Sequence, residues 1–155
     1  MEFEKALDRR RSIRVFDGMP IDKQTIRKIV EEAGHAPSWA NAQPWRVYVA
    51  MGETLSRIRS RHMDLVRRGV RGASDFENMH RGDWGAQAQR NMSGWSQDLF
   101  HRYLKGDPDG SFGLANARLF DASAVAYLTI ERPYPEWSVL DLGAFEQTLA
   151  LAAAN

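Results

Sequence analysis

The sequence predicts an α+β fold in which helices outnumber strands. Apolar residues recur at helical spacing in several segments of the 155-residue chain. Residues 45–50 and 122–130 instead have the alternating or continuous apolar character of β-strands. The length is that of one domain, and the chain contains no internal repeat. We therefore expect a single domain over residues 1–155.

Two helices are expected before residue 36. Phe3, Ala6 and Leu7 form a short apolar stripe at helical spacing. The second helix has clearer limits, because Asp22 is a favourable N-terminal cap and Gly34 a favourable end. The expected buried face of this helix consists of apolar residues three or four positions apart, namely Ile26, Ile29, Val30 and Ala33.

The middle of the chain predicts a strand followed by helices. Residues 45–50 alternate, with Trp45, Val47 and Val49 on one side. A helix is expected next, up to Gly69, on the stripe Leu55, Ile58, His62, Leu65 and Val66. Residues 72–94 are polar and show no clear pattern. Apolar residues from Trp95 to Leu104 predict a further helix that ends at the turn-rich residues 105–113.

The end of the chain predicts a buried strand, a loop and a long helix. Ser138, with Asp141 three residues later, resembles a capping box that would begin this helix. The two strands found are too few for a stable sheet. We therefore expect a partner chain or further C-terminal sequence to complete the fold, and we favour the second.

Composition limits the classes of function. Lys plus Arg number 21 against 20 Asp plus Glu, so no strong overall charge attracts nucleic acid or an anionic membrane. The absence of cysteine excludes disulfides, thiolate metal sites and thiol nucleophiles. The four histidines have no spacing typical of a metal site. We expect a cytoplasmic protein without a metal, a membrane span or a nucleic-acid partner.

The segment "RRRSIR", residues 9–14, is a candidate anion site. Guanidinium groups bind phosphate monoesters through paired, charge-assisted hydrogen bonds and stay protonated, and the hydroxyl of Ser12 can add a further donor. A solvated basic surface is the alternative interpretation of such a run.

The loop "APSWANAQPW", residues 36–45, is unusually rich in amide, hydroxyl and indole groups. One interpretation is that Ser and Asn side chains only tie down an irregular segment. The other is a contact with a ligand. Together, the arginine segment and this loop fit a ligand with an anionic tail and a flat polar ring, such as flavin mononucleotide (FMN).

Residues 10–49, which hold both motifs, resemble the N-terminal block of the nitroreductase family of FMN-dependent oxidoreductases. In this family an Arg-Arg-Ser-x-Arg segment precedes a helix and an Ala-Pro-Ser-x-x-Asn-x-Gln-Pro-Trp loop. Residues 116–123 ("NARLFDAS") and 141–153 ("DLGAFEQTLALAA") resemble later parts of the same family.

The resemblance implies which residues bind the cofactor. Arg10, Arg11 and Ser12 match positions that hold the ribityl phosphate, and Arg14 matches a basic position near the pyrimidine side of the ring. In the family, the loop comes from the other subunit of a homodimer and covers the flavin. The matching loop residues are Pro37, Ser38, Asn41 and Gln43.

The resemblance also implies the fold and the reaction. The expected fold is nitroreductase-like, with a central, mainly antiparallel sheet flanked by helices and completed by dimerisation and by C-terminal strands that this chain lacks. The expected enzyme is an NAD(P)H-dependent flavin oxidoreductase. It passes a hydride through FMN to a small electron-poor acceptor, such as a nitroaromatic or a quinone. No side chain is expected to act as a catalytic acid or base.

A second interpretation comes from the arginines of residues 53–72. The alternatives to the enzyme are a truncated, non-catalytic protein and a domain that binds nucleic acid or another anionic partner through this basic helix. A solvated helix face is the interpretation we favour. The arginines concerned are Arg57, Arg59, Arg61, Arg67, Arg68 and Arg71.

Overall fold

The computed structural model describes residues 3–76, 79–99, 101 and 112–155. It divides into two compact units, Met1–Ile58 with Phe120–Asn155 and Arg59–Leu119. The single domain expected from the sequence stays a prediction. None of the helices in the described ranges combines the length and apolar character needed to cross a membrane.

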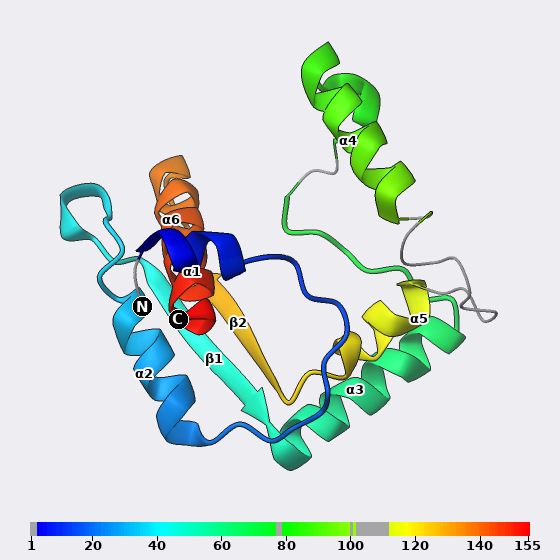
Figure 1. Cartoon of the computed structure of the whole chain (residues 1–155), viewed down its shortest axis with the longest axis horizontal. Helices are drawn as coiled ribbons and strands as arrows, with labels where there is room; N and C mark the ends of the chain where they lie inside the picture. The colour runs from blue at the N-terminus through cyan, green and yellow to red at the C-terminus, as the bar shows by residue number, and fades with distance from the viewer. Residues whose placement is uncertain (1–2, 77–78, 100, 102–111) are drawn as a thin grey trace. The chain divides into compact units, whose positions relative to one another are not determined.

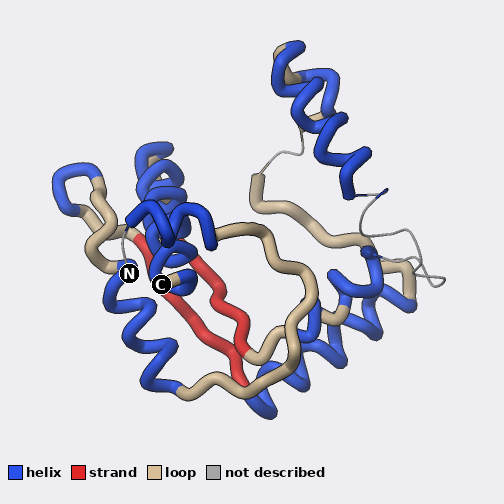
Figure 2. The backbone as a smooth tube through the Cα atoms, in the orientation of Figure 1, coloured by secondary structure: helices blue, strands red, loops and turns tan. Residues whose placement is uncertain are grey.

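The first unit is built on a pair of antiparallel strands, β1 (Trp45–Met51) and β2 (Ala124–Ile130). Val47 lies opposite Leu128 in this pair, and Tyr48 lies opposite Tyr127. Figure 2 shows the two strands in red, running side by side. The predicted strands are confirmed, with β2 beginning two residues later than expected.

The core of the first unit lies where two helices and one face of this strand pair come together. The helix α6 (Glu136–Ala154) contacts both strands and also α2 (Lys23–Ala33) (Figure 1). Phe145 of α6 is 1% exposed. It packs in a cluster with two buried alanines, Ala33 at the end of α2 and Ala36 shortly after it. The half-buried side chains packed against this cluster are Trp45, Val47, Leu128 and Leu149. The α+β prediction is confirmed.

Asp22 begins α2 as predicted. Its carboxylate accepts hydrogen bonds from the backbone N–H of Gln24 at 2.8 Å and of Thr25 at 2.9 Å, and from the Thr25 hydroxyl at 2.7 Å. The side chain of Thr25, followed by its backbone N–H, lowers the pKa of Asp22 below the ordinary value of 3.8. The helix ends at Ala33, and the N–H of Gly34 closes its last turn.

The second unit is helical. The helix α3 (Gly52–Arg67) begins in the first unit and continues into the second, where α4 (Ala86–Asp98) and α5 (Phe112–Ala117) follow. The Nδ1 atom of His62 lies 2.9 Å from the carbonyl oxygen of Ala117. The helix predicted from Trp95 onward begins earlier, at Ala86, and residues 100 and 102–111 lie outside the described ranges. The sequence did not predict α5.

Two details of the predicted helices are wrong. The helix α6 begins at Glu136, so Ser138 and Asp141 lie inside it, 8% and 7% exposed, and do not form its capping box. In α1 (Phe3–Arg9), Ala6 is buried, but Phe3 is 69% exposed. The first error matters for function, because it places a carboxylate in the core.

Candidate functional site

Apart from Arg9, which ends α1, the arginine segment lies in an irregular stretch of chain between α1 and α2. Arg10 is half-buried, whereas Arg11 and Ser12 are exposed. Within the described ranges, neither Arg10 nor Arg11 uses its guanidinium group in an ion pair. Two permanent positive charges and a hydroxyl are therefore available to an anion.

Arg14 is half-buried and lies beside an aromatic ring. Its guanidinium carbon is 5.8 Å from the centroid of Phe120, within the range of a cation–π interaction. Phe120 belongs to a short 3-10 turn, η4 (Leu119–Asp121), whose residues have φ values of 56°, 51° and 56°. Left-handed backbone is unfavourable for such residues, by about 1–3 kcal/mol each, and often marks functional sites. Phe120 thus restricts the position of the Arg14 charge.

The loop of residues 36–45 contains a second left-handed stretch. Its 3-10 turn is η1 (Trp39–Asn41), and φ is 48° at Ala40, 59° at Asn41 and 44° at Gln43. The N–H of Gln43 donates to Oγ of Ser38, and its Nε2 donates to Oδ1 of Asn41, both at 3.0 Å. The polar side chains therefore do tie down the loop. These bonds leave the Asn41 amide nitrogen and the Gln43 side-chain oxygen available to a ligand.

Two residues of α6 hold this loop, one at Trp39 and one at its last residue, Trp45. The backbone N–H of Trp39 donates to Oδ1 and Oδ2 of Asp141, at 3.1 and 3.2 Å. The indole of Trp45 stacks on Phe145, with ring centroids 4.7 Å apart and an interplanar angle of 28°. The sequence analysis missed the role of Asp141. An acidic residue within a largely apolar helix was the available signal.

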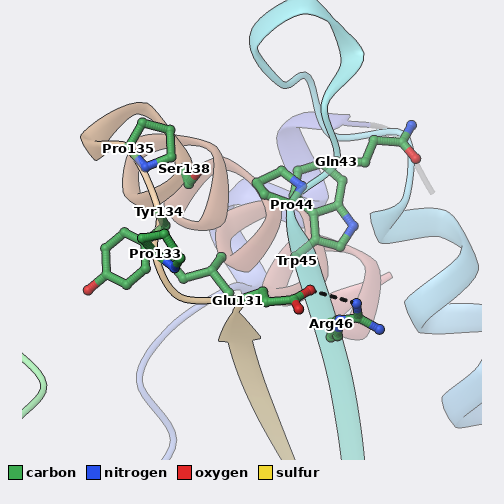
Figure 3. A pocket seen from close by; sticks show the side chains of 10 residues that line it. Gln43, Pro44, Trp45, Arg46, Glu131, Pro133, Tyr134, Pro135 and Ser138 are labelled. Atoms are coloured by element: carbon green, nitrogen blue, oxygen red, sulfur yellow. Dashed lines mark hydrogen bonds and ion pairs between the residues drawn. The ribbon is translucent and has the colours of Figure 1, made fainter.

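A pocket of about 400 Å³ lies between the end of the loop, the strand ends and the start of α6. Figure 3 shows Tyr134, Pro135 and Ser138 on one side of it and Pro44 and Trp45 on the other. An ion pair crosses between the two strand ends, with Nη2 of Arg46 2.9 Å from Oε2 of Glu131. The remaining lining residues are Gln43, Ile130 and Pro133.

The chain does not bring the two predicted halves of the site together. Figure 1 shows the η1 loop beyond the upper left end of β1, whereas the segment that follows α1 runs to the right of β2. Pro37, Asn41 and Gln43 are exposed and Ser38 is half-buried. A single chain thus presents the arginine segment and the loop on different sides.

Some arginines in α3 and just after it already have partners within the second unit. Arg61 and Arg68 both pair with Asp64, at 3.0 and 3.5 Å, and Nε of Arg59 donates to the carbonyl of Arg118 at 2.8 Å. Exposed pairs of this kind contribute little to stability. They do reduce the charge available to an anionic partner.

Known proteins resemble the chain over almost its whole length. Residues 7–155 match the model of the nitroreductase family. The 4-nitrobenzoate reductase of Pseudomonas putida is 30% identical over 159 residues, which cover 99% of this chain and 68% of the reductase. The 4-nitrobenzoate reductase of Nocardioides sp. (strain LMS-CY) is 28% identical, over 99% of this chain and 64% of the reductase. The chain thus spans about two thirds of the length of these relatives.

The fold resembles that of a solved nitroreductase structure. The crystal structure of the FMN-dependent nitroreductase NfnB from Mycobacterium smegmatis, in complex with NADPH, superposes with a TM-score of 0.84 at 27% identity. The superposition covers 96% of this chain and 68% of NfnB. Fold, motifs and family model agree, and the chain belongs to the nitroreductase family.

Proposed function

We propose that the protein is an FMN-dependent oxidoreductase that passes a hydride from NAD(P)H through the flavin to an electron-poor acceptor. The observation that carries the proposal is the arginine segment, with two uncommitted guanidinium groups beside the positioned Arg14. Nitroaromatics and quinones are the proposed acceptors. The nitrobenzoate reductases and NfnB, which are its relatives by sequence and fold, support this choice.

The donors of the arginine segment suit the phosphate of FMN. Arg10 and Arg11 would bind its oxygens through paired, charge-assisted hydrogen bonds, and Ser12 would donate a third contact. Each such bond to a charged group is worth about 1.5–3 kcal/mol. Arg10, Arg11 and Ser12 lie outside any helix or strand. Their side chains are therefore not fixed on different faces of an element and would converge on one phosphate.

Arg14 would tune the cofactor. Bound FMN supplies the redox chemistry of the reaction. Arg14 would offer a permanent positive charge to the negative charge that develops on reduction, and it would therefore favour reduction. The Phe120 ring keeps this guanidinium in place.

We also propose a homodimer in which each loop covers the cofactor of the other subunit. On α6, Trp137 and Leu140 are 58% and 63% exposed, and Leu140 lies on the side of the helix away from Phe145. Gly143, three positions after Leu140, is exposed on that side too, and it allows a neighbouring backbone to come close. Pro37, Ser38, Asn41 and Gln43 would then contact the partner's FMN. We place the protein in the cytoplasm, which suits a chain without cysteine.

The first experiment is a visible absorption spectrum of the purified protein after FMN has been added and the excess removed. We expect flavin bands that remain with the protein and bleach when NADPH is added without oxygen. Protein that retains no flavin contradicts the proposed function.

Substitutions test the site. We expect Arg10→Ala and Arg14→Ala each to lower FMN affinity by about tenfold or more, since each removes a charge-assisted contact. The measurement is a fluorescence titration with FMN. Arg27→Ala, an exposed arginine on α2, is the matched control and leaves the affinity unchanged. Wild-type affinity in both site variants would show that FMN binds elsewhere.

A further inference from the structure

The loop of residues 39–45 is attached to one helix at both ends. Asp141 holds its first residue, Trp39, and Phe145 holds its last, Trp45. Asp141 and Phe145 are four positions apart in α6 and therefore lie on one face, separated by a single turn. We call these two residues the α6 clamp.

The carboxylate of Asp141 has a specific task in this clamp. It is 7% exposed, and burial of a charged group is unfavourable unless donors satisfy it. An apolar side chain at this position would serve the packing of α6 better. Instead, both carboxylate oxygens accept a hydrogen bond from the backbone N–H of Trp39, which lies 102 positions away in the sequence. Its contribution is therefore to fix the backbone of the loop.

The chain between the two anchors has an unfavourable conformation. Ala40, Asn41 and Gln43 all have positive φ, and no glycine lies among residues 39–45. Such backbone persists only where the surrounding structure determines it. The indole of Trp39 is nevertheless 64% exposed. The clamp thus fixes the backbone while it leaves side chains of the loop accessible.

We propose that the α6 clamp presets the loop in its FMN-binding conformation, with Asp141 as a positioning residue. The proposal rests on the proposed function, in which Asn41 and Gln43 contact the cofactor. A loop that is already ordered avoids the entropic cost of ordering on binding, so preorganisation raises affinity. Asp141 itself acts through Trp39 and does not touch the cofactor.

Backbone amide hydrogen exchange, measured by NMR in the protein without FMN, tests the first half of the proposal. In Asp141→Ala the amide of Trp39 exchanges faster by about tenfold or more, because a hydrogen bond to a charged group is lost. Amides of β1 keep their wild-type rates and serve as the internal reference. Asp141→Asn keeps the side-chain volume and one acceptor oxygen, so its Trp39 rate is intermediate.

Glu146→Gln is the matched control, since it removes an exposed negative charge from the same helix. It leaves the Trp39 rate unchanged. A wild-type Trp39 rate in Asp141→Ala overturns the proposal. If that variant does not fold, Asp141→Asn decides, and a wild-type rate there overturns the proposal equally.

A titration with FMN tests the second half. We expect Asp141→Ala to bind FMN about tenfold more weakly, and Glu146→Gln to bind it as the wild type does. Faster exchange at Trp39 with unchanged FMN affinity overturns the positioning role. If the wild type binds no FMN, the proposed function fails, and the exchange rates alone decide whether the clamp sets the loop.

Discussion

At the scale of single residues, Asp22 determines where α2 begins. Three hydrogen bonds from Gln24 and Thr25 favour its ionised form in the folded protein. The pKa of Asp22 is lowered, chiefly by the Thr25 hydroxyl. The capping contribution is therefore present above the unfolded-state value of 3.8 and is lost as the pH falls through the lower, folded-state value.

The lowered pKa of Asp22 predicts how the stability of the protein changes with pH. Asp22→Ala lowers the melting temperature at pH 7, and the difference from the wild type shrinks as the pH falls below 3.8. Thermal unfolding followed by circular dichroism at a series of pH values measures it. Asp22→Asn keeps a neutral cap, so its melting temperature should not show this additional pH dependence. A difference between Asp22→Ala and the wild type that is constant from pH 7 to pH 2 would contradict the prediction.

At the scale of elements, α6 connects the core with the loop of the site. Its buried face carries Ser138, Asp141 and Phe145, at positions i, i+3 and i+7. Phe145 packs into the cluster of buried residues and also stacks on Trp45. A loss of packing at this one residue therefore affects two elements, α6 and β1.

We expect Phe145→Ala to lower the free energy of unfolding by about 3–5 kcal/mol, since it leaves a cavity in the core. Urea denaturation at pH 7 measures this change. Glu146→Ala, on the exposed side of the same helix, should stay within about 0.5 kcal/mol of the wild type. A loss at Phe145 no larger than at Glu146 would show that α6 is not packed as described.

At the scale of the whole molecule, the arginine segment and the loop lie on different sides of one chain (Figure 1). In the proposed homodimer, a second copy would complete a site that needs both. FMN binding would then depend on dimer formation. Asn41→Ala should then weaken FMN binding through the partner's site.

Mixed dimers test the shared site. Arg10→Ala and Asn41→Ala subunits each bind FMN weakly as homodimers. Once mixed, a heterodimer holds one site with an intact arginine segment and an intact loop, because the two defects fall together in the other site. In an equal mixture about half of the dimers are heterodimers, each with one intact site of two, so about a quarter of the wild-type FMN binding should return, measured by retained absorbance. No recovery on mixing, or a monomer that binds FMN normally, would contradict a site formed by two subunits.

Local patterns were sufficient for much of the fold. Asp22, the stripe from Ile26 to Ala33 and the alternation of residues 45–50 predicted α2 and β1, because caps and periodic apolar faces depend on residues a few positions apart. The start of α6 was misplaced for a related reason. Ser138 and Asp141 have the spacing of a cap, and only packing shows that both are buried.

The sequence by itself determined the family, the helices and strands with clear periodicity, and the two motifs proposed to bind FMN. The tertiary structure decided how those motifs are held. Trp39 and Phe120 lie in turns with left-handed backbone. Their contacts with Asp141 and Arg14 join residues far apart in the chain. Such contacts follow from the packing of whole elements, and no short-range pattern encodes them.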